Sequence, residues 1–145
     1  MDPANPVVQL CARGMQAEFA GRLAEASAHF AQAWQAAADD YEACVAAHFV
    51  ARHQADPRDA LRWNQVALAR AQAVPGERVR GFYPSLYLNL GYAYENVGDM
   101  DNARQHYALA AERLVDLDDG PYAEVVRGGV AAGLARTGPE NEAGP

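Results

Sequence analysis

The chain contains no lysine, because all 12 of its basic residues are arginine. This absence excludes Schiff-base catalysis, a lysine general base and the phosphate-binding lysine of a P-loop. Aliphatic hydroxyl groups are also scarce, since only Ser27, Ser85 and Thr137 carry one. None of the three lies in the G-x-S-x-G context that presents a serine nucleophile. We therefore expect a protein that is not an enzyme, with no catalytic residue and no cofactor.

Cysteine and histidine patterns give no sign of a metal or redox site. Cys11 and Cys44 are the only cysteines, and their spacing matches no zinc or disulfide framework. Two buried, reduced thiols of a cytosolic protein are the favoured interpretation. His48 and His53 are not spaced i and i+4, as two ligands on one face of a helix would be. We predict no metal site.

The charge and hydropathy of the chain limit its partners. A net charge of −7 and the lack of a basic stripe argue against binding to nucleic acid. No apolar run approaches the length of a membrane span, and the N-terminal residues lack the basic and apolar regions of a secretory signal. We expect a cytoplasmic protein that binds neither nucleic acid nor membranes. Abundant alanine and arginine, without lysine or isoleucine, suggest a GC-rich bacterial source.

Apolar residues recur at helical spacing in seven segments bounded by capping or breaking residues. Asn5-Pro6 and Asp56-Pro57 read as an N-cap followed by proline in the first turn. The acidic residues from Asp116 to Asp119 are interpreted as caps for the last segment. We predict an all-α fold without strands, with helices at about 6–20, 22–38, 41–54, 57–73, 84–97, 100–117 and 121–136.

One stretch carries a specific pattern of small and aromatic residues: Leu90-Gly91-x-x-Tyr94-x-x-x-Gly98-x-x-x-x-Ala103-x-x-x-Tyr107-x-x-Ala110. Read as two helices, it puts Gly91 and Ala103 where the backbones approach closely. Tyr94 and Tyr107 fill the space beside them, and Gly98 permits the turn. The pattern resembles the tetratricopeptide repeat (TPR), a helix–turn–helix unit of about 34 residues. The resemblance implies a right-handed α-solenoid of three helix hairpins with a C-terminal capping helix.

Two weaker copies of the pattern precede this one. The three copies are Gly14, Gly21, Ala26, Phe30 and Ala33; His48, Ala55, Ala60, Asn64 and Ala67; and Gly91, Gly98, Ala103, Tyr107 and Ala110. The phase of the second copy is left open. We predict a single domain over 1–136, with repeats at about 7–40, 41–74 and 84–117 and a capping helix at about 120–136. Residues 137–145 are predicted to form a disordered tail.

The resemblance also implies a function, because TPR proteins bind a peptide or helix of a partner in a concave groove lined by the first helix of each repeat. The groove positions selected as partner contacts are Phe49, Arg52, His53, Asn89, Tyr92 and Glu95. An alternative is that the chain is a self-association module that forms a homodimer. A further alternative is a small-ligand sensor or enzyme with a polar pocket at this site. A structural interpretation also stays open, in which Arg52 pairs with Glu95 and the aromatic residues from Phe82 to Tyr92 belong to the core.

Overall fold

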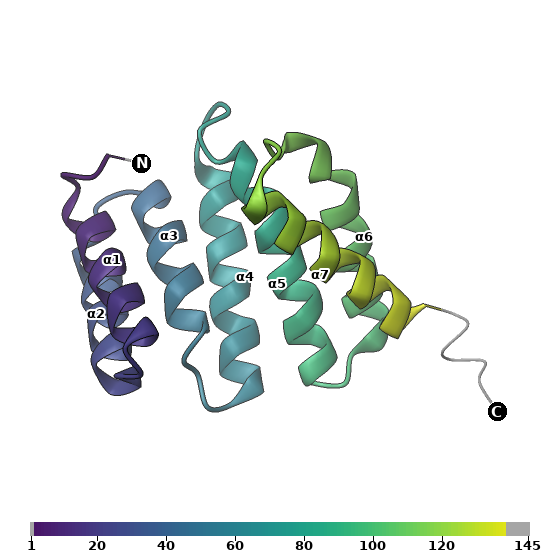
Figure 1. Ribbon diagram of the computed structural model, residues 1–145, viewed down its shortest axis with the longest axis horizontal. Coiled ribbons are helices and arrows are strands. Elements are labelled where there is room, and N and C mark those ends of the chain that lie inside the picture. The colour runs from purple at the N-terminus through teal and green to yellow at the C-terminus, as the bar shows by residue number, and fades with distance from the viewer. Residues whose placement is uncertain (1, 139–145) are drawn as a thin grey trace. The chain divides into compact units, whose positions relative to one another are not determined.

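The computed structural model describes residues 2–138, and over that range the chain is all-helical, with seven α-helices and no strand (Figure 1). The predicted all-α class is confirmed. No helix in the described part is long and apolar enough to cross a membrane. The chain divides into two compact units, Met1–Pro75 (unit 1) and Gly76–Pro145 (unit 2), which are described separately below. Most of the predicted tail, residues 139–145, lies outside the described residues.

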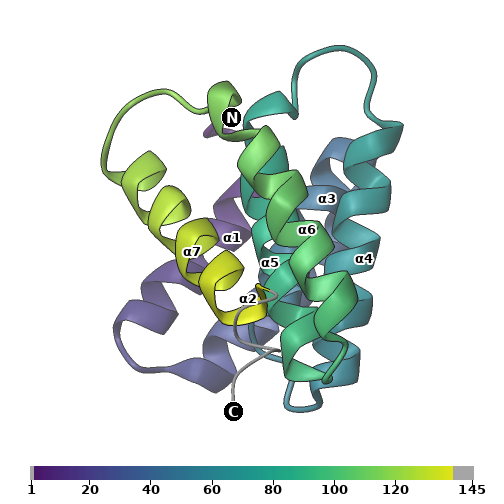
Figure 2. The ribbon, with the colours of Figure 1, turned by 90° about the vertical axis from the view of Figure 1, so that its right-hand side faces the viewer.

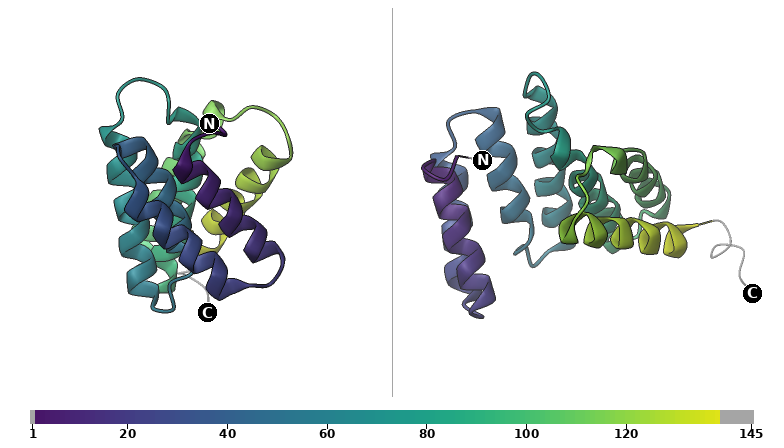
Figure 3. Two further views of the ribbon diagram at one scale, coloured as in Figure 1. Left: turned by 90° about the vertical axis from the view of Figure 1, so that its left-hand side faces the viewer. Right: turned by 45° about the horizontal axis from the view of Figure 1, so that its top comes forward.

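Unit 1 consists of two helix hairpins. Its helices are α1 (Pro6–Phe19), α2 (Leu23–Ala36), α3 (Asp40–Ala51) and α4 (Pro57–Ala73). Helix α1 packs along α2, and α3 packs along α4; α3 also packs against α2 and touches α1 (Figures 1 and 3). Alanines without exposed surface, such as Ala26, Ala33 and Ala67, let these helices approach closely.

Capping side chains begin three of these helices, and two of them, Asn5 and Asp56, are those predicted. Asn5 Oδ1 accepts the amides of Val7 and Val8 at the start of α1. Asp39 Oδ1 accepts the Glu42 amide at the start of α3, and Asp56 Oδ1 accepts the Arg58 amide at the start of α4. Each bond satisfies an amide that has no partner within its helix.

Unit 2 contains one hairpin and a third long helix. Its elements are the short 3-10 helix η1 (Arg80–Phe82), α5 (Tyr83–Asn96), α6 (Met100–Glu112), the 3-10 helix η2 (Leu114–Asp116) and α7 (Pro121–Thr137). Helices α5 and α6 form the hairpin, and α7 packs against α6 and also contacts α5 (Figure 2). The third long helix therefore packs on the hairpin, mainly through its second helix. Thr137, predicted to start the tail, is the buried last residue of α7.

The acidic cluster before α7 does not cap that helix, so this prediction was wrong. Gly120 occupies the N-cap position, and no side chain caps the helix. Asp116 instead forms ion pairs with Arg80 and Arg113, and Asp119 pairs with Arg127. Asp116 therefore links η2 to η1 and to the end of α6, whereas Asp119 pairs with an arginine on α7.

The turns of the α1–α2 and α5–α6 hairpins have the same backbone geometry. Gly21 and Gly98 have positive φ angles of 78° and 83°, which glycine adopts without steric cost. The residue after each glycine donates its amide to a carbonyl one turn back, Arg22 to Ala17 and Asp99 to Tyr94. This is the Schellman arrangement that ends helices at a glycine. The predicted role of Gly98 as the turn residue is therefore supported.

Candidate functional site

In unit 1, a carboxylate on α1 links two side chains at the end of α3. Glu18 Oε1 lies 3.2 Å from Arg52 Nη2, and Glu18 Oε2 lies 2.6 Å from His53 Nε2. The Glu18 and His53 side chains are each 15% exposed, whereas Arg52 is 47% exposed. Arg52 is the C-cap residue of α3, so this cluster joins the C-terminal ends of two helices.

Aromatic rings pack beneath this cluster. Phe30 of α2 stacks on Phe49 with the ring centres 5.0 Å apart, and on the His53 ring at 5.6 Å. The Arg52 guanidinium carbon lies 5.4 Å from the centre of the Phe49 ring, within the range of a cation–π contact. Three of the predicted partner contacts, Phe49, Arg52 and His53, are thus brought together around Phe30 and Glu18.

Unit 2 contains a corresponding carboxylate on α5. Arg136 of α7 donates to both oxygens of Glu95, with Nη2 to Oε1 at 2.9 Å and Nε to Oε2 at 3.1 Å. The hydroxyl of Tyr107 on α6 also donates to Glu95 Oε1, at 2.5 Å. The Arg136 hydrogen bond, with that of Tyr107 and against the opposing effect of burial, lowers the pKa of Glu95. Glu95 is therefore the ionised centre of a three-helix contact.

Glycines make room for the aromatic ring in both units. A Cβ atom added at Gly14 would lie 2.3 Å from Phe30, one at Gly91 would lie 2.7 Å from Tyr107, and one at Gly133 would lie 2.4 Å from Tyr107. No side chain fits in such a space. The predicted close contact at Gly91 is present, and the second glycine against Tyr107 comes from α7.

The two clusters occupy corresponding positions in the sequence. Gly91, Glu95 and Tyr107 follow Gly14, Glu18 and Phe30 by the same number of positions. In each unit the first helix supplies the glycine and the glutamate, and the second helix supplies the aromatic ring. The third helix supplies the arginine, Arg52 from the end of α3 or Arg136 from α7. One local arrangement therefore occurs twice.

The remaining predicted contact residues lie on α5 in unit 2. Tyr92 is 58% exposed, and Asn89 is partly buried. The suggested ion pair between Arg52 and Glu95 is replaced by two others, since Arg52 pairs with Glu18 and Glu95 pairs with Arg136. The predicted positions in unit 1 thus surround a buried ring, while Tyr92 faces solvent.

The aromatic residues whose role was left open differ in their surroundings. Tyr87 packs against the unit 2 core formed by Ala110, Val126 and Val130. The Arg113 guanidinium lies 4.5 Å from the centre of the Tyr83 ring. Tyr87 therefore belongs to the core of unit 2, whereas the exposed Tyr92 does not.

Arg136 was missed by the sequence interpretation. At the spacing that relates the other residues of the two clusters, the position equivalent to Arg52 is Gly129, so spacing along the chain does not indicate Arg136. Its pairing with Glu95 depends on how α7 packs against α5.

Other ionisable groups of unit 1 are held uncharged. Burial raises the pKa of Cys11 to about 11 and that of Cys44 to about 12, and both are free thiols. Burial, assisted by the nearby charge of Arg52 and opposed by Glu18, lowers the pKa of His48 to about 4. Thiols with a raised pKa are poor nucleophiles at neutral pH. These groups therefore supply no activated nucleophile.

No metal-binding cluster of three or more His, Cys, Asp or Glu side chains occurs among residues 2–138. The arrangement offers ion pairs and packed rings. Comparisons with family models, with curated proteins and with solved structures find no match for this chain.

Proposed function

We propose that the chain is a TPR-type, non-enzymatic interaction module of the cytoplasm. In this proposal it forms a right-handed solenoid and binds a peptide or helix of a partner protein through its first helices. The observation that carries the proposal is the repeated three-helix arrangement. Each unit has a hairpin, a glycine–aromatic contact inside it, and an arginine from the next helix bound to a glutamate of the first.

The repetition favours a solenoid, because similar helical units that stack on one another in sequence form one. Helix α7 packs mainly on the second helix of its hairpin and also touches the first, as α3 does in unit 1. A repeat cannot bury its apolar face alone, so a following helix is required. In unit 2 that helix is α7, which fits the predicted role of a cap.

Exposed apolar side chains on the first helices support partner binding. Phe19 of α1 is 98% exposed and Met15, one turn earlier, is also exposed, as is Tyr92 of α5. Large aromatic and methionine side chains are common at the centres of protein interfaces. Arg52 adds a half-exposed guanidinium that can bind a carboxylate. We therefore expect a partner segment with apolar residues and an acidic side chain or free C-terminus.

A peptide-display selection against the purified protein tests this proposal. Peptides that are enriched would be titrated by calorimetry against Arg52→Ala, which changes unit 1, and Asn89→Ala, which changes unit 2. The matched controls are Arg62→Ala and Gln105→Ala, which remove an arginine and an amide from exposed positions on the second helices α4 and α6.

The proposal expects at least one of the first-helix variants to weaken binding by about tenfold, as loss of an interface contact worth about 1.4 kcal/mol would. The controls should bind as the unmodified protein does. Equal affinities for all four variants, or a selection that enriches no peptide, would contradict the proposal.

Self-association is a second candidate, favoured by the outward face of α7. Val125 is 73% exposed and Tyr122 is also exposed on this helix. Gly128, which has open space at its Cβ position, lies on the same face one turn further on and permits close approach of another helix. If α7 forms a homodimer, light scattering will give twice the chain mass, and Val125→Glu will restore the monomer. A monomeric mass at high concentration would rule this candidate out.

A further inference from the structure

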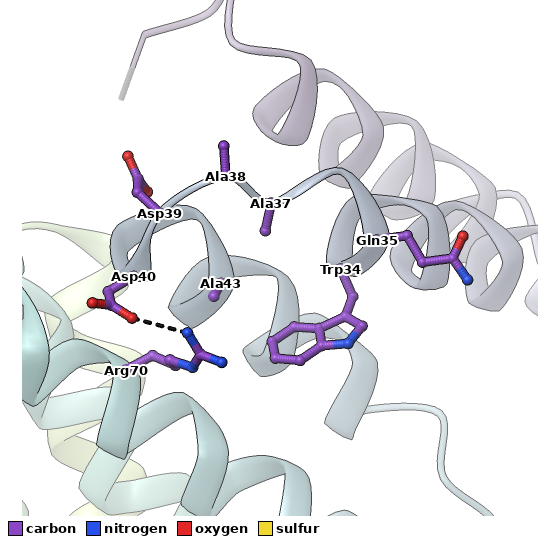
Figure 4. A pocket seen from close by; sticks show the side chains of 8 residues that line it. All are labelled: Trp34, Gln35, Ala37, Ala38, Asp39, Asp40, Ala43 and Arg70. Carbon is purple, nitrogen blue, oxygen red and sulfur yellow. Dashed lines mark hydrogen bonds and ion pairs between the residues drawn. The ribbon is translucent and has the colours of Figure 1, made fainter.

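A cleft of about 550 Å³ opens on unit 1, away from the Glu18 cluster. It lies where the end of α2, the α2–α3 connection, the start of α3 and the last turns of α4 meet (Figure 4). Its lining residues are Trp34, Gln35, Ala37, Ala38, Asp39, Asp40, Ala43 and Arg70. The volume is in the range of sites that hold a small molecule or a partner side chain.

The wall of this cleft is fixed by hydrogen bonds. The Ala37 amide donates to the Trp34 carbonyl, and the Ala38 amide donates to Glu42 Oε1 at 2.9 Å. Glu42 Oε2 accepts a bond from Asn5 Nδ2, which ties the α2–α3 connection to the start of α1. The cleft therefore needs little ordering when a ligand enters, and this favours binding.

The chemistry of the lining favours a cation. Asp39 and Asp40 are acidic and Arg70 is the only basic lining residue, so the cleft carries one excess negative charge. Asp39 uses Oδ1 to cap α3 and its carboxylate points away from Trp34, whereas the Asp40 carboxylate faces Arg70 (Figure 4). The indole of Trp34 offers a large aromatic face, and indole is the aromatic group that attracts cations most strongly.

The protein's own Arg70 shows how a guanidinium is held here. Its Nη1 lies 2.9 Å from Asp40 Oδ1, and its guanidinium carbon lies 5.8 Å from the centre of the Trp34 ring. Both charged side chains are nearly half exposed, so the pair is weakly held and can rearrange. An anion would have to displace Asp40 from Arg70 and lie close to Asp39, and it is therefore disfavoured.

We propose that this cleft is a second binding site, separate from the first-helix surface, which takes an arginine side chain of a basic peptide segment. The arginine binds against the face of Trp34 and pairs with Asp40 in place of Arg70. Arg70 occupies part of the same space and competes with the ligand. This site consequently prefers a basic segment. The exposed residues Met15, Phe19, Arg52 and Tyr92 are instead proposed to bind a segment with an acidic side chain or a free C-terminus.

Tryptophan fluorescence reports on this cleft directly. Trp34 and Trp63 are the only tryptophans, and their rings are in edge contact with centres 5.0 Å apart. The titrant is the capped tripeptide Gly-Arg-Gly, compared with Gly-citrulline-Gly, which has the same shape without charge, and with Gly-Glu-Gly. The unmodified protein is compared with Arg70→Ala, with Asp40→Asn, in which Asp39 still caps α3, and with Arg62→Ala, which removes one exposed arginine elsewhere on α4.

The arginine peptide should change the emission in a saturable way, and the citrulline and glutamate peptides should not. Arg70→Ala should raise the affinity by about two- to fivefold and Asp40→Asn should lower it by a similar factor, as expected for contacts of cation–π and exposed ion-pair strength. Arg62→Ala should bind as the unmodified protein does. If the arginine and citrulline peptides behave alike, if the glutamate peptide binds instead, or if Arg62→Ala matches Arg70→Ala, the proposal is wrong. None of these outcomes depends on Arg52 or Asn89, so the proposed function is tested independently.

Discussion

At the scale of single residues, the packing of unit 2 depends on glycines, because a position without a side chain leaves room for a large ring. Tyr107 is fully buried, and its ring lies against Gly91 on one helix and Gly133 on another. Its hydroxyl still reaches Glu95 and Arg136, so burial of the ring leaves no polar atom without a partner. Small residues on two helices are therefore needed to accommodate one large residue on a third.

The variant Gly91→Ala should destabilise the protein by about 1–3 kcal/mol, because the added methyl group meets the buried Tyr107 ring and overpacks the contact. Gly128→Ala is the control, since nothing lies within 4 Å of its Cβ position. In a helix, that change should stabilise by about 0.5–1 kcal/mol. Urea unfolding of the two variants measures both effects, and a Gly91→Ala protein at least as stable as the unmodified one would contradict the packing described.

His48 should make stability depend on pH. Its pKa is lowered from 6.5 to about 4 in the folded protein, so in this window the unfolded chain binds the proton more readily. The free energy of unfolding should therefore fall as the pH decreases from 6.5 towards 4, and should be unaffected by His48 above 6.5. The variant His48→Gln should lose about 1–3 kcal/mol of this pH dependence. Urea unfolding at a series of pH values measures it, and parallel curves for the two proteins would show that His48 is not responsible.

At the scale of helices, the starts of four elements were predictable because capping is local. Asn5, Asp39, Asp56 and Asp99 each bind amides within the next few residues, so the sequence next to them contains the whole interaction. The Schellman turn at Gly98 is local in the same sense.

The contacts between helices could be predicted only in part. The small residue Gly91 and the aromatic Tyr107 indicated a close approach within one hairpin. Arg136 lies on a later helix, and its pairing with Glu95 depends on how α7 packs against α5 and α6. The contact of Arg70 with Trp34 likewise requires two separate hairpins to pack together. Neither pairing is determined by spacing along the chain.

Removing α7 tests its role as a cover. Truncation after Asp119 would expose the buried ring of Tyr107 and the apolar surface around Ala110 that Val126 and Val130 cover. We expect aggregation or loss of cooperative unfolding, because a large apolar face would meet water. Static light scattering and thermal unfolding measure this, and truncation after Gly138 is the control. A soluble truncated chain with an unchanged melting temperature would show that α7 is dispensable.

At the scale of the whole molecule, the prediction of one domain over 1–136 stays a prediction. The division at Pro75 and Gly76 separates the probes that spectroscopy can follow. Both tryptophans and both cysteines belong to unit 1, whereas every tyrosine except Tyr41 belongs to unit 2. Unfolding of each unit can therefore be observed on its own in the intact chain.

If the chain is one continuous solenoid, its two units should unfold together. Tryptophan emission and the labelling of the buried thiols Cys11 and Cys44 would follow unit 1, and the near-ultraviolet circular dichroism of tyrosine would follow mainly unit 2. We expect the urea midpoints of these signals to coincide, as they do in a two-state transition. Separate midpoints would indicate two independently stable domains.

The space around Tyr107 has a consequence for ligand design. Replacing Tyr107 by glycine would leave a flat slot between the backbones of α5 and α7, with Glu95 and Arg136 at the position of the lost hydroxyl. Cavities left by a removed apolar ring take up small aromatic guests, and Glu95 and Arg136 would bind the hydroxyl of such a guest at one end of this slot. Phenol should therefore raise the melting temperature of this variant in a concentration-dependent way, and toluene, which has no hydroxyl group for Glu95, should do so less. In the unmodified protein the slot is filled, and neither guest should have an effect. Removing the side chain at the contact of three helices would thus give a variant in which an added molecule controls whether unit 2 is folded.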